Sequence, residues 1–292
     1  MSFRVEKLAP TLGARVTGVD LSSDLDATTV GMIETALSEH GVLAFPGQLM
    51  NDGAHARFAG YFGELQTFAP ASTEDKHVRA IYRSANVQID GSMMSSDHES
   101  NRLLKLNWLW HADSTYRRLP NKGTVLRVAE CASRGGDTVF ANMTASYEAL
   151  PRSMRDSISS LDARHSFEFM VSTQGLAPLG REELSGFVPV EHPLVRQHAG
   201  GKQSLFLSPP YMENIVGWDR AESRTLVQEL LEWATQPRFL YQHRWRAGDV
   251  VMWDNGWTMH KVTPFDVEKT RRVMYGAVLL GNGPVEPINV LG

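Results

Sequence analysis

The 292 residues of the chain are enough to bury one large core, and a composition of 42% hydrophobic and 21% charged residues is that of a globular enzyme. A net charge of −4 argues against a nucleic-acid partner, which would require a basic patch. The single cysteine, Cys131, excludes an internal disulfide framework. Because Met1 to Gly13 holds no apolar leader and no run reaches about 18 apolar residues, we expect a cytoplasmic protein that does not enter a membrane.

The first third of the chain predicts short strands around two helices. The helices, at about Ala27 to Glu39 and Asp52 to Phe62, are each followed by a glycine. Glycine commonly ends a helix because it adopts a left-handed conformation without strain. The expected strands are Arg15 to Asp20 and Gly41 to Phe45.

A polar segment follows at about 88–102. It is rich in small and polar residues and includes Asp90-Gly91-Ser92. Segments of this composition lack a core of their own. We expect a mobile loop that acts as a lid and becomes ordered over the site when substrate binds.

The rest of the chain predicts a β-rich core. Short runs bounded by Gly, Pro, Asn, Asp or Ser are typical of a sandwich or barrel. Helices are expected at Ala145 to Leu161 and after Asp219, where a capping sequence precedes an apolar face. No linker or repeat divides the chain, so we expect a single domain over residues 1–292, mainly β with flanking helices. The expected strands are Leu106 to Trp110, Thr124 to Ala129, Thr138 to Ala141, Ser204 to Leu207, Val250 to Trp253 and Val273 to Leu280.

The most informative motif is His111-x-Asp113. On a regular strand, residues i and i+2 point to the same face, so the imidazole and the carboxylate would lie side by side. His260 would complete a set of two histidines and one carboxylate, the facial triad of non-heme Fe(II) oxygenases, which leaves metal positions open for O2 and a cosubstrate. A histidine alone is more often a hydrogen-bonded core residue than a ligand, so this interpretation depends on the combination.

Two further motifs support the same chemistry. Gly135-Gly136-Asp137-Thr138 follows the His-x-Asp motif, and the pair Arg271-Arg272 follows His260. An arginine binds a carboxylate through two parallel hydrogen bonds and stays charged at any working pH, and a threonine hydroxyl adds a directed donor. Neither Gly-x-Gly-x-x-Gly nor a P-loop is present, so nucleotide chemistry has no anchor in the sequence.

On these residues the chain resembles the taurine dioxygenase / 2,4-dichlorophenoxyacetate dioxygenase (TauD/TfdA) family of Fe(II)- and 2-oxoglutarate-dependent dioxygenases. The resemblance extends from residues 13–21 through Phe62-Gly63-Glu64-Leu65 to Arg272-Val273-Met274. It implies a double-stranded β-helix, or jelly roll. It also implies that 2-oxoglutarate is converted to succinate and CO2 while O2 oxidises a small-molecule substrate.

The resemblance implies roles for individual residues. In the family pattern, His111, Asp113 and His260 correspond to the iron ligands. Thr138 and Arg272 correspond to the pair that holds the distal carboxylate of 2-oxoglutarate. Asn107 corresponds to a position beside both the substrate and the 2-oxoglutarate site.

The departures from the family concern the substrate. Members that bind anionic substrates carry an arginine where this chain has Gly276, and the taurine enzymes place a histidine and a tyrosine where it has Phe68 and Ala71. A small sulfonate would be left without compensating groups in such a pocket. We therefore expect an aromatic or aryloxyalkanoate-like substrate, with any carboxylate bound by a residue such as Arg271 or Asn107.

The sequence leaves several alternatives open. The same chemistry could act on a sulfonate or on a natural-product intermediate. A Zn-dependent hydrolase could use the same three ligands with an activated water, but it would have no use for Thr138 and Arg272. A non-catalytic jelly-roll binding protein would give no reason for an intact triad. The sequence does not decide whether the protein is a homo-oligomer.

Overall fold

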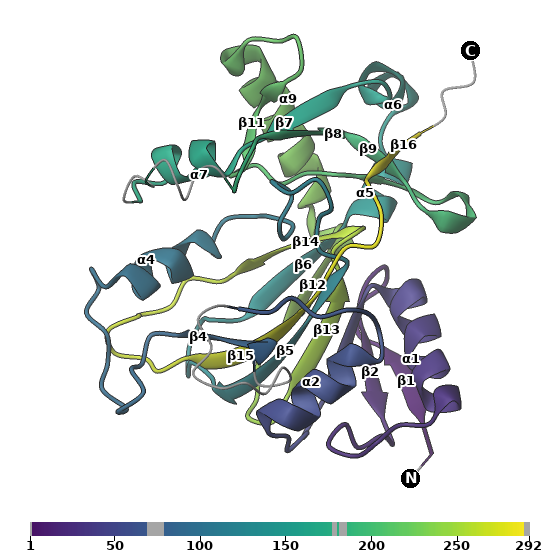
Figure 1. Cartoon of the computed structure of the whole chain (residues 1–292). Coiled ribbons are helices and arrows are strands. Elements are labelled where there is room, and N and C mark those ends of the chain that lie inside the picture. Colours follow the sequence, from purple (N-terminus) through teal and green to yellow (C-terminus); the bar gives the residue numbers. More distant parts are fainter. Residues whose placement is uncertain (1, 69–78, 177–179, 181–185, 289–292) are drawn as a thin grey trace.

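The computed structural model describes residues 2–68, 79–176, 180 and 186–288, and its strands form a jelly roll flanked by helices (Figure 1). The larger sheet has seven strands in the order β1-β2-β3-β13-β5-β15-β4, antiparallel except for the pair β2 and β3. Its strands are β1 (Arg4–Lys7), β2 (Ala14–Thr17), β3 (Val42–Phe45), β13 (Val250–Asp254), β5 (Gly123–Glu130), β15 (Val273–Leu279) and β4 (Ile81–Ala85).

Three smaller sheets complete the strands. The order β12-β6-β14 forms the second layer of the jelly roll, and the orders β11-β7-β8 and β10-β9-β16 lie at one end of the molecule, at the top of Figure 1. Their strands are β12 (Leu240–His243), β6 (Thr138–Asn142), β14 (Thr258–Val262), β11 (Met212–Ile215), β7 (Asp162–His165), β8 (Val190–Pro193), β10 (Gln203–Leu205), β9 (Val195–Gln197) and β16 (Glu286–Pro287).

Helices lie outside the strands. α1 and α2 lie beside the larger sheet, α4 lies at the left beside β4, and α7 and α9 lie at the top with β11 (Figure 1). The helices are α1 (Ala27–His40), α2 (Asp52–Gly60), α4 (Glu99–Leu106), α5 (Met143–Glu148), α6 (Arg152–Ile158), α7 (Phe167–Thr173) and α9 (Arg220–Ala234), with short 3-10 turns at η1 (Ala199–Gly201) and η2 (Pro237–Phe239). None of the described helices is long and apolar enough to cross a membrane.

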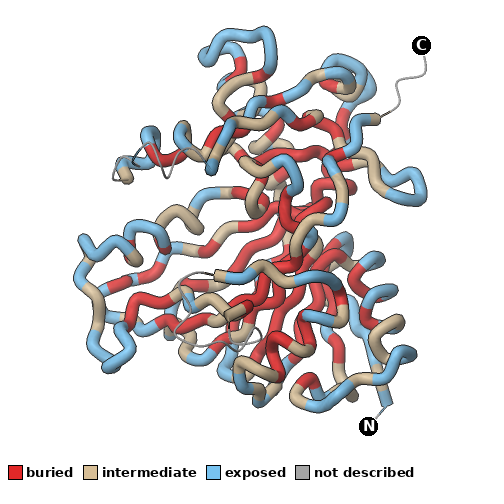
Figure 2. The backbone as a smooth tube through the Cα atoms, in the orientation of Figure 1, coloured by how far each residue is buried: buried red, intermediate tan, exposed pale blue. Residues whose placement is uncertain are grey.

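The main core lies between the two layers of the jelly roll. Phe140 of β6 is fully buried, its ring centroid lies 5.5 Å from that of Trp253 of β13, and Met274 of β15 joins the same cluster. A second cluster, which includes Ile33 of α1 and Phe58 of α2, covers the other face of the larger sheet. Figure 2 shows the buried residues concentrated along the strands, as the burial of apolar surface requires.

The predicted helix boundaries are confirmed where a cap defines them. Asp26 accepts a hydrogen bond from the backbone of Thr29 at the start of α1 (2.7 Å), and Gly41 ends this helix with φ 67°. Asp219 caps α9 in the same way. The helix predicted at 145–161 is broken, because Pro151 separates α5 from α6.

The strand predicted at Leu106 to Trp110 is wrong. The backbone N–H groups of Asn107, Trp108 and Leu109 donate to carbonyls three residues earlier, so the chain stays in turns after α4. Extended pairing is limited to a single bridge at His111. The other predicted strands are present with shifted ends.

The segment at 88–102 is only in part the loop that we expected. Residues 88–98 form turns, but the end of the segment belongs to α4. Asn101, which is fully buried, donates from its side-chain amide to the carbonyls of Met94 and Ser95 (3.2 and 2.7 Å). Some polar side chains of this segment therefore make internal hydrogen bonds instead of facing solvent. Closure over the site stays a prediction.

A buried histidine of α2 predicts how stability depends on pH. The Nε2 atom of His55 donates to the carbonyl of Val125 (3.0 Å), and burial, helped by Arg127, lowers the pKa of His55 to about 3. Because the unfolded chain takes up this proton at about pH 6.5, stability is complete above that pH and is lost as the pH falls toward 3. We expect His55 to contribute a loss of roughly 1.4 kcal/mol per pH unit in that range. Urea unfolding of wild type and His55→Gln between pH 7 and 4 should show a shallower slope in the variant, and equal slopes would contradict the assignment.

Candidate metal centre and cosubstrate site

The two histidines of the predicted triad are brought together by backbone pairing. The backbone N–H of His111 donates to the carbonyl of His260 (2.9 Å), and the reverse hydrogen bond is 2.8 Å long. The two rings therefore face each other, with centroids 4.3 Å apart. Asp113 follows in a turn, so the three side chains converge although no regular strand carries the His-x-Asp motif.

The atoms that face one another are the ones a metal would need. The Nε2 atoms of His111 and His260 lie 3.7 and 3.8 Å from Oδ1 of Asp113, and the ligand atoms of all three residues lie within 4.8 Å of one another. Two imidazoles and a carboxylate with open positions are the ligand set of non-heme Fe(II).

Hydrogen bonds around the triad leave these atoms free. His111 donates from Nδ1 to the carbonyl of Leu109 (2.8 Å), which leaves its Nε2 lone pair toward Asp113. The other carboxylate oxygen of Asp113, Oδ2, accepts from Thr124 Oγ1 (3.1 Å) and Asn255 Nδ2 (3.2 Å). Oδ1 is therefore the oxygen directed at the histidines, so the residues fit a metal ion.

Burial keeps one ligand neutral. His260 is 6% exposed, and its burial, followed by the neighbouring His111, lowers the pKa of His260 to about 3. A neutral imidazole offers the lone pair that a metal requires. No sequence motif predicted that Thr124 and Asn255 would contact Asp113, because their hydrogen bonds reach it from distant segments of the chain.

The turn after Asp113 is strained. Ser114 has φ 57°, the left-handed region that non-glycine residues seldom adopt, and it is the one such residue in the described part of the chain. Its hydroxyl accepts a hydrogen bond from Asn121 Nδ2 (2.6 Å), which holds this conformation. Such strain is found where the surrounding structure fixes a functional side chain.

Arg272 is a buried cation that lacks an acidic partner. It is 3% exposed, and its Nε donates to the carbonyl of Gly136 (3.2 Å). Among the described residues, no carboxylate lies within ion-pair distance of the guanidinium. Burial lowers the pKa of Arg272 to about 10, so the group stays charged at neutral pH. A buried charge of this kind is costly unless an anion pairs with it.

Thr138 lies two residues after Gly136, whose carbonyl accepts from Arg272, and its strand β6 pairs with β14, which carries His260. Gly136, with φ 71°, lets the Arg272 side chain pack against the turn, since a Cβ atom at this glycine would lie 3.3 Å from Cδ of the arginine. The Thr138 hydroxyl accepts from Trp245 Nε1 (3.0 Å) and keeps its own proton available. Thr138 lies two residues before Phe140, which pairs with His260 across β6 and β14. Tyr82 lies near the charges of both Arg272 and Asp113, so an anion at Arg272 would lie in the same part of the molecule as the triad.

Arg271 is placed differently. It is exposed and pairs with Glu130 through Nε (2.5 Å) and Nη2 (3.0 Å), while its Nη1 donates to the carbonyl of Gly91 (2.6 Å). The structure brings Arg272 but not Arg271 to the interior. Arg271 is thus not placed to meet a substrate carboxylate.

A cavity of about 360 Å³ contains Asn107 and is lined mostly by apolar and aromatic side chains. The lining residues are Tyr82, Arg83, Ser84, Ala85, Met94, Ser100, Leu103, Leu104, Leu106, Asn107, Phe167, Met170 and Tyr211. Asn107 ends α4, and its carbonyl accepts from the backbone of Val262 (2.6 Å). This contact fixes Asn107 next to the strand that carries His260.

The structure corrects the expectation for Gly276. The residue is not an empty apolar position, because Tyr82 of β4 lies directly opposite and fills it. A Cβ atom at 276 would come within 2.3 Å of two ring carbons of Tyr82 and 2.5 Å of its hydroxyl oxygen. An arginine there would collide with the ring. Phe68 packs against Tyr82, with centroids 5.3 Å apart, and Ala71 lies outside the described residues.

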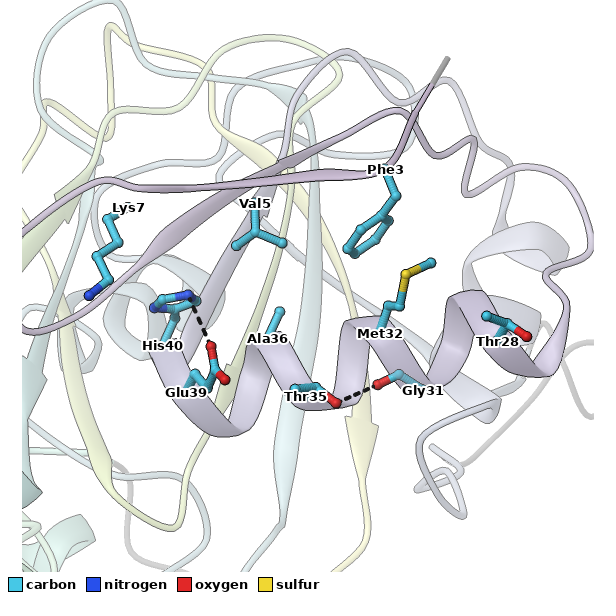
Figure 3. Close-up of a pocket in the computed structure, with 10 residues that line it drawn as sticks. All are labelled: Phe3, Val5, Lys7, Thr28, Gly31, Met32, Thr35, Ala36, Glu39 and His40. Atoms are coloured by element: carbon cyan, nitrogen blue, oxygen red, sulfur yellow. Dashed lines mark hydrogen bonds and ion pairs between the residues drawn. The ribbon is translucent and has the colours of Figure 1, made fainter.

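A second hollow of about 730 Å³ lies between β1 and α1 (Figure 3). In Figure 3, Phe3 and Val5 extend from the strand toward Met32 and Ala36 of the helix. Neither hollow has a member of the triad or Arg272 in its described lining. We assign the chemistry to the cavity of about 360 Å³ because it contains Asn107, whose carbonyl accepts from Val262 of β14, the strand that carries His260.

Comparisons with known proteins show the family of the chain. The model of the family described as "Taurine catabolism dioxygenase TauD, TfdA family" matches residues 4–278. The 2,4-dichlorophenoxyacetate dioxygenase of Cupriavidus pinatubonensis is 33% identical, with 96% of this chain and 98% of that protein covered. The (S)-phenoxypropionate/alpha-ketoglutarate-dioxygenase of Sphingobium herbicidovorans is 35% identical, with 96% of each chain covered. A solved structure of AAD-2 with Mn(II) and N-oxalylglycine has a TM-score of 0.89 and 31% identity, covering 98% of this chain and 99% of that one.

A jelly roll with two histidines and a carboxylate beside a buried arginine defines a class, the non-heme iron oxygenases that use a keto acid. The chain belongs to the TauD/TfdA family of this class. It is an Fe(II)- and 2-oxoglutarate-dependent dioxygenase that acts on a small molecule.

Proposed function

We propose that this dioxygenase hydroxylates an aromatic or aryloxyalkanoate-like compound and releases succinate and CO2. His111, Asp113 and His260 hold Fe(II), and Arg272 with Thr138 holds the distal carboxylate of 2-oxoglutarate. The bound metal and keto acid supply the oxidising chemistry with O2. The observation that carries these roles is the buried Arg272 charge, which has no acidic partner among the described residues and which, like the Asp113 carboxylate, lies near Tyr82.

The substrate class is supported by the aromatic side chains around the cavity. The ring of Tyr116 lies 4.8 Å from Phe167, 5.0 Å from Tyr211 and 5.6 Å from Phe187, measured between centroids. Phe167 and Tyr211 line the cavity itself. Flat rings favour offset or edge-on contacts with other rings, so this wall suits an aromatic substrate. The relatives named for phenoxy acids point the same way.

The alternatives are weaker on the same grounds. A small sulfonate would bring a charge to an apolar wall, and Tyr82 occupies the position from which a cation at 276 would reach it. A natural-product intermediate with an aromatic ring would fit the same cavity and stays a second candidate. A zinc hydrolase would leave the buried Arg272 without a role.

A comparison of two compounds tests the substrate class. We expect kcat/KM for phenoxyacetic acid to exceed that for taurine by more than about a hundredfold, because the phenoxy ring packs against the aromatic wall and leaves water, whereas taurine has no ring to fill the cavity. Succinate formation should be measured together with consumption of each compound, so that uncoupled turnover is subtracted. A preference for taurine would contradict the proposed substrate class while leaving the metal site intact.

A further inference from the structure

The hydroxyl group of Tyr82 is a donor without a partner. Among the described residues it makes no hydrogen bond, although its side chain lines the cavity beside Asn107. Burial raises the pKa of Tyr82 above its ordinary value, and the nearby carboxylate of Asp113 adds to the shift. The phenol therefore keeps its proton and is able to donate. Tyr82 is half-buried, so a ligand that closes the cavity over its hydroxyl must accept this hydrogen bond to avoid leaving the donor unpaired.

The surroundings of this donor favour a ligand with a flat ring. Phe68 packs on the Tyr82 ring, and Phe167 and Tyr211 line the same cavity. Arg83, the next residue on β4, also lines the cavity, and its side chain donates to the carbonyl of Gln88 (3.5 Å).

Packing alone does not account for the tyrosine. An aromatic ring over a glycine on the neighbouring strand stabilises an antiparallel sheet, and Tyr82 over Gly276 is such a pair. That role needs the ring only. A phenylalanine would fill it without placing an unpaired hydroxyl inside the cavity.

We propose that Tyr82 determines substrate specificity by donating a hydrogen bond from its hydroxyl to an uncharged oxygen of an aromatic substrate. The inference rests on the proposed function, because it places the substrate in the same cavity. An ether, carbonyl or hydroxyl oxygen satisfies the donor without bringing a charge to the apolar wall. The ring also keeps the cavity free of a longer side chain at position 276.

Two acids of matched shape test the hydrogen bond. Phenoxyacetic acid and 3-phenylpropionic acid differ in the exchange of the ether oxygen for a methylene group, so the ratio of their Kd values isolates the acceptor. With Fe(II) and 2-oxoglutarate bound and O2 excluded, calorimetry of the wild type should give a Kd about three- to tenfold lower for phenoxyacetic acid. Tyr82→Phe keeps the ring and removes the hydroxyl, so it should bring the ratio close to one.

Tyr275→Phe is the matched control, because this tyrosine lies on the opposite face of the sheet and contacts Arg127 instead of the cavity. It should keep the wild-type ratio. If the ratio is unchanged in Tyr82→Phe and the wild type still hydroxylates phenoxyacetic acid, the role of Tyr82 is overturned and the proposed function stands. Failure of both acids to bind the wild type would overturn this inference together with the proposed substrate class.

Discussion

Asp113→Ala should abolish turnover, because Oδ1 of Asp113 is the carboxylate oxygen that faces both histidine Nε2 atoms. Its removal leaves two neutral imidazoles and no negative charge for the metal. We expect Fe(II) affinity to fall by more than about a hundredfold, since even the partners that orient a ligand are worth about 10- to 100-fold. The weak visible charge-transfer band of Fe(II) with 2-oxoglutarate, recorded without O2, should disappear, while circular dichroism shows an intact fold.

A variant that keeps all three ligands but removes a hydrogen bond to Asp113 should have a smaller effect. Thr124 donates to Oδ2 of Asp113 and does not face the histidines, so Thr124→Val should retain the band and weaken Fe(II) by about 10- to 100-fold. His111→Ala should behave as Asp113→Ala does. A band of full strength in both alanine variants would contradict the assignment of the triad.

Arg272→Ala should weaken 2-oxoglutarate binding by about 2–5 kcal/mol, as expected when one partner of a buried charge pair is removed. The neighbouring Arg271 gives a matched control of the same charge, since it is exposed and paired with Glu130. Arg271→Ala should change the 2-oxoglutarate affinity little. Arg272→Lys should restore only part of it, because an ammonium does not reproduce the planar fork of arginine.

Anaerobic calorimetry with 2-oxoglutarate on the Fe(II)-loaded variants measures these differences. Equal or reversed losses for the two arginines would show that the register of the pair is off by one residue. The same titration in Thr138→Val should show a smaller loss, because that hydroxyl contributes one neutral hydrogen bond.

The sequence predicted the parts of this molecule that depend on local signals. Asp26 and Gly41 bracket α1, and the apolar runs of β13 and β15 form strands as expected. The residues of the triad were found because three motifs occurred together, although the strand on which we placed His111 and Asp113 does not exist. A bridge to β14 brings them together instead.

The parts that could not be predicted depend on residues distant in sequence. Tyr82 and Gly276 meet only because β4 pairs with β15, and nothing near either residue in the sequence signals the contact. The same holds for Thr124 and Asn255, which orient Asp113 from other segments. The prediction for the polar segment before the triad was wrong in part. Asn101 donates buried hydrogen bonds to backbone carbonyls of the turns, and composition does not reveal these contacts.

Succinate formation from 2-oxoglutarate, measured with phenoxyacetic acid present, tests the central claim most directly. The assay compares protein loaded with Fe(II), protein loaded with Zn(II), and the Asp113→Ala and Arg272→Ala variants loaded with Fe(II). We expect succinate in step with substrate loss for the Fe(II)-loaded wild type in the presence of O2, and little or none in the other three. Substrate conversion by the Zn(II)-loaded protein without 2-oxoglutarate, or undiminished succinate formation in Asp113→Ala, would contradict the central claim.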